Sequence, residues 1–202
     1  MSADAVQVPS LEEFLTRHIA PRFAEQVKEL EKRRVEIERQ LADLQAAEGT
    51  IAWEIQGPEP IVRYANFSSG QMRIESEPTH PPVMTIVQTP EQWARFATGL
   101  SIPFGTDPRR PLGKSRLDRI KTLMGSVRFV LTGLEGGDLS CLIVFGDAPK
   151  EGEARVTITL PMSAVAEIQH GKLDPQAAFM QGKIKLAGDM GFAMQVGMTL
   201  LL

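Results

Sequence analysis

The side chains that could carry out catalysis are few in this sequence and far apart along the chain. None of the three histidines, His18, His80 and His170, has a second histidine or a cysteine at the spacing of metal ligands. The single cysteine, Cys141, lies in the apolar stretch 139–145. We expect it to be a small buried hydrophobic residue, with a reactive thiol as the alternative. The sequence therefore predicts no enzyme, no metal and no cofactor.

The charge of the chain limits the kind of partner. The net charge is −3 and no long run of lysine or arginine occurs, whereas a nucleic acid needs a concentrated basic surface. Arg109 and Arg110, in a proline-containing loop over residues 102–114, could attract a membrane headgroup, but exposed arginines are more often a solvated turn. No stretch approaches the roughly 20 apolar residues of a membrane span. We expect a cytoplasmic protein with at most transient membrane contact.

The chemistry that the sequence does offer is apolar binding. Five of the nine methionines fall within residues 162–202. Methionine is unbranched and polarizable, so it suits a lining that adapts to a hydrophobic ligand. Such a lining needs only one or two polar groups to orient the ligand. By itself, however, a methionine-rich stripe is more typical of ordinary core packing.

These methionines surround the stretch GKLDPQAAFMQGKIKLAGDM, residues 171–190. This stretch resembles the C-terminal signature of the sterol carrier protein-2 (SCP-2) family. The resemblance extends less strictly backward through ARVTITLPMSAVAEIQHG, residues 154–171, and to a hairpin beginning near Val127. It thus covers roughly the last 80 residues. Members of the family enclose a lipid between a β-sheet and its helices. The resemblance therefore implies an α+β fold in which helices cover one face of a mixed sheet.

The resemblance also implies roles for individual residues. Phe179 and Met180 match the family's apolar pair at the wall of the ligand tunnel, and Gln181 matches a glutamine that can reach the polar portion of the ligand. Gly182 and Gly188 match structural glycines. With two aromatic residues of an earlier helix, the candidate ligand-binding residues are Trp93, Phe96, Phe179, Met180, Gln181, Met190, Phe192 and Met194.

Two features depart from the family pattern. Phe192 stands where the family usually has a smaller aliphatic residue, within a flexible segment near the end of the tunnel. The terminal residues 198–202 are apolar and could fold inward. Either feature would narrow or close the tunnel.

The N-terminal 49 residues lie outside the resemblance and are predicted to be helical. Ser10 and Glu13 form a capping box at the start of a short helix. Pro21 either interrupts this helix or starts the next one. Apolar residues then recur at alternating steps of four and three, which is typical of a heptad seam, up to a C-terminal cap at Gly49. The seam consists of Phe23, Val27, Leu30, Arg34, Ile37, Leu41 and Leu44.

This seam predicts a coiled coil between two copies of the chain. About three heptads is the lower limit for an independent coiled coil. In a parallel pair, Arg33 and Glu38 would occupy flanking positions of opposite charge, which favours a homo-oligomer through residues 23–44. Arg34 within the seam weakens the pairing, although its stem can lie along the apolar surface. Packing of the helix on its own globular domain is the alternative.

After Gly49 the hydrophobic pattern changes to period 2 and predicts a sheet. A turn or loop rich in glycine, proline or serine separates most of the expected strands. Two helices are expected before the family signature, one opening at Thr89-Pro90 and one over residues 117–124. The expected strands are 51–55, 61–67, 71–75, 83–87, 127–131, 139–145 and, after the second helix of the family signature, 183–186.

The sequence also indicates an internal duplication. A strand followed by a helix and a glycine begins near Thr85 and again 72 residues later near Thr157. We therefore predict a helical segment at 1–49 and one domain at 50–202, built from units 50–114 and 115–202. Two ordinary strand–helix pairs of similar length are the alternative.

These observations favour a non-enzymatic carrier of a hydrophobic small molecule such as a lipid, a fatty acyl compound or a sterol-like compound. The alternative is an assembly or accessory subunit with a filled core of the same fold. Such a subunit would bind a partner enzyme through residues 11–48 or an exposed strand edge.

Overall fold

The computed structural model describes residues 10–99 and 111–200, and the contacts divide the chain into two compact units, residues 1–42 and 43–202. Arg109, Arg110 and most of the loop predicted at 102–114 lie outside the described residues. The division between the sheet domain and the N-terminal segment at residue 49 stays a prediction.

The N-terminal unit is helical, as predicted. Helix α1 (Leu11–Phe14) begins with the predicted capping box, in which the Glu13 amide donates to the Ser10 hydroxyl at 3.2 Å. A π-helical turn, η1 (Leu15–Ile19), leads directly into α2 (Ala20–Gln45), so the chain stays helical through Pro21. A proline ring clashes with the carbonyl four residues earlier in an α-helix. The wider π turn just before Pro21 relieves that clash.

The π turn also aligns the apolar residues of the first turns with the seam. Leu11, Leu15, Ile19 and Phe23 follow one another at steps of four. In an α-helix a step of four exceeds a full turn of 3.6 residues, so such a run drifts around the helix. In a π turn, which bonds five residues back, a step of four falls short of a full turn. The two deviations offset each other, and the apolar stripe continues into residues 27–44.

The second unit is built on one eight-stranded sheet with the order β3-β2-β1-β4-β6-β5-β7-β8. The sheet is mixed, because β1–β4 and β5–β7 are parallel pairs and the other neighbours are antiparallel. Its strands are β1 (Gly49–Ile55), β2 (Ile61–Ser68), β3 (Gln71–Glu75), β4 (Pro82–Gln88), β5 (Gly125–Thr132), β6 (Leu139–Phe145), β7 (Val156–Pro161) and β8 (Lys185–Gly188). The helices are α3 (Pro90–Gly99), α4 (Lys114–Ile120), α5 (Met162–Gln169), α6 (Pro175–Met180) and α7 (Met190–Leu200).

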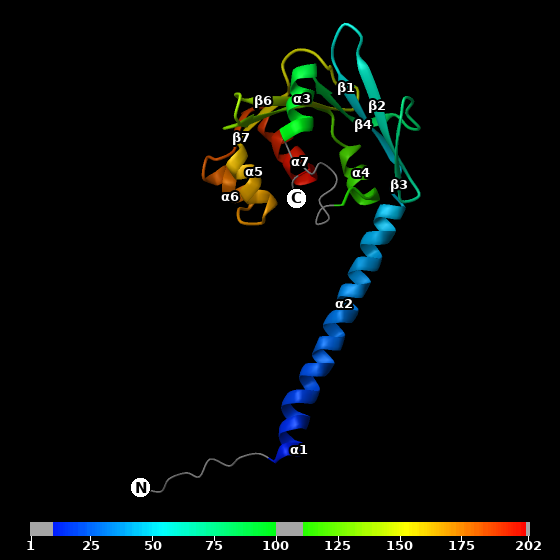
Figure 1. Ribbon diagram of the computed structural model, residues 1–202, viewed down its shortest axis with the longest axis vertical. Helices are drawn as coiled ribbons and strands as arrows, with labels where there is room; N and C mark the ends of the chain where they lie inside the picture. The colour runs from blue at the N-terminus through cyan, green and yellow to red at the C-terminus, as the bar shows by residue number, and fades with distance from the viewer. Residues whose placement is uncertain (1–9, 100–110, 201–202) are drawn as a thin grey trace. The chain divides into compact units, whose positions relative to one another are not determined.

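The two faces of the sheet are packed differently because successive side chains of a strand point to opposite faces. On β6, Ile143 and Phe145 belong to the main core, whereas Leu142 and Val144 belong to a small separate cluster. Helices α4, α5, α6 and α7 all contribute buried side chains to the main core. Figure 1 shows these four helices on the same side of the sheet. The predicted fold, a mixed sheet with helices covering one face, is confirmed.

Two groups of three strands share one arrangement. Strand β1 pairs antiparallel with β2 and parallel with β4, and β5 pairs antiparallel with β6 and parallel with β7. A helix, α3 or α5, follows the last strand of each group. The next strand differs, since β8 pairs directly with β7 whereas β6 separates β5 from β4. The arrangement supports the predicted duplication without deciding it, and the unit boundaries stay predictions.

Gly188 at the end of β8 offers a test of close backbone packing. Its φ is +102°, and a Cβ there would lie 2.5 Å from the carbonyl oxygen of Arg155, the residue just before β7. We expect Gly188→Ala to lower the free energy of unfolding by about 2–4 kcal/mol, because it combines an unfavourable φ with a backbone clash. Urea unfolding measures the change.

Gly197→Ala is the matched control, since Gly197 lies inside α7 with open space around the position of a Cβ. It should leave stability unchanged or raise it by up to about 1 kcal/mol, because alanine favours a helix more than glycine does. Equal effects of the two substitutions on the free energy of unfolding would contradict the close backbone packing at Gly188.

Candidate functional site

The first group of predicted ligand residues lies at the end of α6. Asp174 caps this helix by accepting hydrogen bonds from the amides of Gln176 and Ala177, and Pro175 occupies its first turn. The helix ends in Gln181 and Gly182, whose φ is +68°. Met180 and Gln181 are exposed, and so is Phe179, with an exposed fraction of 37%.

The second group lies on α7, which has two apolar faces. Phe192 and Val196, four residues apart, are buried in the main core together with Ala193. A second series at steps of four points outward, and its members are Met190, Met194 and Met198, with exposed fractions of 45, 60 and 63%. Three flexible apolar side chains are therefore aligned along the solvent side of the helix.

Phe192 packs in the interior. It is 1% exposed, and its ring meets the ring of Phe145 on β6 edge to face, with the centroids 6.2 Å apart. The guanidinium of Arg155 lies 4.6 Å from the centroid of the Phe192 ring, within the range of a cation–π contact. The residue that departs from the family pattern is thus a core residue in this structure.

Asp189 holds the start of α7 to the sheet. Its Oδ1 accepts from the Phe192 amide at 2.9 Å, and its Oδ2 accepts from Nε and Nη2 of Arg155 at 2.9 and 2.7 Å. Nη1 of Arg155 also donates to the Met124 carbonyl at 2.7 Å. The hydrogen bond from the Phe192 amide, followed by the Arg155 side chain, lowers the pKa of Asp189 below its ordinary value. The carboxylate is thus engaged in protein contacts.

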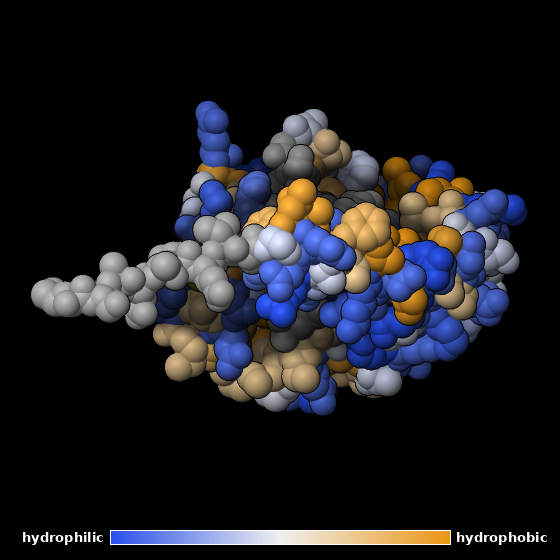
Figure 2. Space-filling model, turned by 90° about the horizontal axis from the view of Figure 1, so that it is seen from below, coloured by the Kyte–Doolittle hydropathy of each residue, from blue (hydrophilic) through white to orange (hydrophobic). Residues whose placement is uncertain are grey.

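The remaining two candidates, Trp93 and Phe96, stack on each other on α3 with ring centroids 6.2 Å apart. Helix α3 packs on β4 and β6, whereas α7 packs on β7, β8 and α4. The eight predicted residues therefore form three groups, on α3, at the end of α6 and on α7. Apolar residues lie among hydrophilic ones on the surface seen in Figure 2.

The groups that could react are constrained by their surroundings. Burial raises the pKa of the Cys141 thiol to about 12, against an opposing effect of the Arg128 charge. The thiol is therefore protonated at neutral pH, and a thiol in that form is a poor nucleophile. Nδ1 of His170 lies 2.7 Å from the Ala166 carbonyl within its own helix. Among residues 10–99 and 111–200, no three His, Cys, Asp or Glu side chains are grouped as metal ligands would be.

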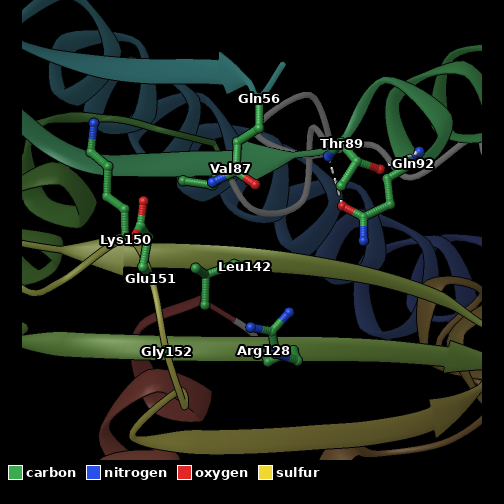
Figure 3. Close-up of a pocket in the computed structure, with 9 residues that line it drawn as sticks. All are labelled: Gln56, Val87, Thr89, Gln92, Arg128, Leu142, Lys150, Glu151 and Gly152. Carbon is green, nitrogen blue, oxygen red and sulfur yellow. Dashed lines mark hydrogen bonds between the residues drawn. The ribbon is translucent and has the colours of Figure 1, made fainter. Parts of the chain in front are cut away.

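A pocket that the sequence did not predict lies over the other face of the sheet, with a volume of about 240 Å³. Val87 and Leu142, which belong to the small cluster on that face, form its apolar part. Arg128 on β5 lies beside Leu142 on β6, and the loop at 150–152 also lines the pocket (Figure 3). The available signal was a single arginine within the otherwise apolar strand 127–131.

Comparison with known proteins identifies the C-terminal part of the chain. The model of the SCP-2 sterol transfer family matches residues 109–201. This region belongs to the SCP-2 family. The resemblance found in residues 154–190 is thereby confirmed.

Two curated relatives are similar to part of this chain. Sterol carrier protein 2 of Rattus norvegicus is 43% identical over 53 residues, which are 26% of this chain and 9% of that protein. Hydroxysteroid dehydrogenase-like protein 2 of Xenopus tropicalis is 31% identical over 84 residues, or 39% of this chain and 20% of that protein. The chain thus spans no more than a fifth of either relative.

Solved structures of sterol carrier proteins are also similar to part of this chain. The solution structure of the sterol carrier protein domain 2 of Helicoverpa armigera is 29% identical and covers 39% of this chain and 68% of its own, with a TM-score of 0.32. The apo form of sterol carrier protein 2 from Yarrowia lipolytica is 22% identical and covers 48% of this chain and 81% of its own, with a TM-score of 0.33.

The lowered pKa of Asp189 predicts a pH-dependent contribution to stability. A carboxylate whose pKa is depressed on folding stabilises the native state above its ordinary pKa of 3.8, and this stabilisation is lost as the pH falls through the folded value. Asp189→Asn should therefore lower the free energy of unfolding at pH 7. The difference from wild type should shrink below pH 3.8, as measured by urea unfolding between pH 2.5 and 7.

The control is Asp138→Asn, which removes the same charge from an exposed position. Within the described part of the chain, no hydrogen bond or ion pair engages the Asp138 carboxylate. Its stability profile should follow that of wild type. A difference between Asp189→Asn and wild type that stays constant down to pH 2.5 would refute the role of the ionised carboxylate.

Proposed function

We propose that the SCP-2 region binds and carries a hydrophobic small molecule, such as a lipid, a fatty acyl compound or a sterol-like compound, without transforming it. The assignment of residues 109–201 to the SCP-2 family carries this proposal. The outward methionines of α7 and the apolar end of α6 support it, because adaptable side chains exposed in the free protein gain most from being covered.

In this proposal the ligand exchanges water for methionine and phenylalanine side chains. Burial of ten methylenes contributes about 8 kcal/mol before ordering costs, which corresponds at most to micromolar affinity. The exposed amide of Gln181 orients the polar end of the ligand. Since Phe192 fills the interior, the ligand lies against the outer side of α7 or displaces this helix.

A matched set of substitutions tests the site. Met190→Glu combined with Met194→Glu should raise the Kd for a fluorescent fatty acid at least tenfold, because a carboxylate cannot be buried against an alkyl chain. Met72→Glu is the control, since Met72 is similarly exposed but lies on β3. Fluorescence titration of the full chain measures Kd. Equal affinities of the three proteins would exclude the outer side of α7 as the site.

The alternative is an accessory subunit whose filled core only supports the fold. The packing of Phe192 against Phe145 favours it, because this contact occupies space between α7 and the sheet. The curated relative with a hydroxysteroid dehydrogenase-like name suggests an enzyme as the partner. Native mass spectrometry of the protein purified from its host separates the two: an apolar ligand at near-equal stoichiometry supports the carrier, and a ligand-free protein that retains an enzyme supports the subunit.

We further infer that two copies of the chain associate in parallel through the seam at residues 23–44. The N-terminal helix buries none of these side chains by itself. Arg33 and Arg34 form ion pairs with Glu29 and Glu38 of the same helix at 3.3 and 3.7 Å. Exposed pairs of this kind stabilise little, so Arg33 stays available to Glu38 of the second copy.

Leu30→Asp should convert the dimer into a monomer, because it places a charge in the seam. Val35→Asp, an equally exposed position outside the seam, should leave the dimer intact. Arg34→Leu should tighten the dimer by removing a charge from the seam. Sedimentation equilibrium of the full chain measures the association. A wild-type chain that is monomeric at about 100 µM would contradict the dimer and favour packing on the globular domain.

No helix within the described residues combines the length and the apolar content needed to cross a bilayer. A location in the cytoplasm is part of this proposal and stays a prediction.

A further inference from the structure

The pocket over the second face of the sheet contains a cation without a protein partner. Arg128 is partly buried, and among the described residues no hydrogen bond or ion pair engages its guanidinium. Its neighbours across the sheet are Leu142 on β6 and Thr157 on β7, neither of which carries a charge. A guanidinium without a counter-ion keeps all its hydrogen-bond donors available to an incoming anion.

The other basic residue of the pocket is already neutralised. Lys150 donates to Glu54 at 2.5 Å, and the Glu54 side chain is only 15% exposed. Glu151 is the one carboxylate that lines the pocket, and it is exposed with no ion pair to Arg128. Of the two basic side chains that line the pocket, Arg128 is therefore the one without an ion pair among the described residues.

Further donors surround the same space. The side-chain amide of Gln56 lines the pocket, and no hydrogen bond within the described part of the chain engages it. Gln92 belongs to the first turn of α3, where its Oε1 accepts from the Thr89 amide at 2.9 Å (Figure 3). Its Nε2 donates to the Ser140 hydroxyl at 2.9 Å, so this amide is held in a fixed position.

We propose that this pocket binds a small organic carboxylate, with Arg128 as the cationic anchor. A guanidinium pairs with a carboxylate through two parallel hydrogen bonds, and Gln56 can supply a further donor. Val87 and Leu142 offer an apolar surface to a short carbon chain. A volume of 240 Å³ equals that of about eight water molecules, which suits an acid of that many non-hydrogen atoms.

One free cation beside an apolar surface fits a monocarboxylate better than a phosphate, which carries more charge and more acceptor oxygens. The site lies on the face of the sheet opposite to α6 and α7, so this inference does not rest on the carrier function.

Butyrate is a suitable probe, and inorganic phosphate is the comparison. In ¹⁵N-resolved NMR of the full chain, butyrate should shift the amide signals of Gln56, Arg128 and Leu142 with a millimolar Kd. Arg128→Gln should raise this Kd at least fivefold, and Arg128→Lys should raise it less, because a lysine keeps the charge but loses the paired geometry. Glu151→Gln should lower it about two- to threefold by removing a nearby negative charge.

Arg119→Gln is the control, since Arg119 is exposed on α4 and does not line the pocket. It should leave the Kd unchanged, and thermal unfolding establishes that each variant is folded. Three results would overturn the proposal: shifts confined to residues away from the pocket, an unchanged Kd in both Arg128 variants, or phosphate binding as tightly as butyrate. None of these results bears on binding of the fluorescent fatty acid, so the two proposals can fail separately.

Discussion

The packing of α7 on the sheet determines which side chains of the SCP-2 region are buried and which are exposed. Phe192 fills the space above Phe145, and Arg155 joins the sheet to the start of α7 through Asp189. Because Gly188 lacks a side chain, β8 can lie close to β7 just before α7 begins. These contacts fix which side of α7 faces the core, and they leave the three methionines at 190, 194 and 198 on the outer side.

Much of the fold could be predicted from local signals. The capping box of Ser10 and Glu13, the alternating strands and the turn glycines each act over a few residues, and the corresponding elements are present. The start of β8 was predicted two residues early, because alternation alone does not show where pairing with β7 begins. The sequence analysis did not predict that the helix continues without interruption through Pro21. The π turn before Pro21 makes this possible, and helix propensities do not indicate a π turn.

The candidate site could be predicted only in part, because tertiary packing decides which apolar residue is buried. Phe192 and Met194 are two residues apart on one helix, yet one is in the core and the other is exposed. Their residue types do not distinguish them. Their position relative to the sheet does, and it follows from the Asp189 cap and from the register of β8. The pocket around Arg128 is lined by strands β4, β5 and β6, the start of α3 and two loops, which are distant in sequence, so no local pattern could indicate it.

The two faces of the sheet therefore offer different chemistry. On the side covered by the helices, Phe192 fills part of a large apolar core, and Met190, Met194 and Met198 lie outside this core. The carrier and accessory-subunit proposals thus differ in what covers the outer side of α7, a hydrophobic ligand or the surface of a partner. On the opposite side, a small apolar cluster lies beside an unpaired guanidinium. A purely apolar ligand gains nothing from that charge, so the arginine favours a ligand that carries its own negative group.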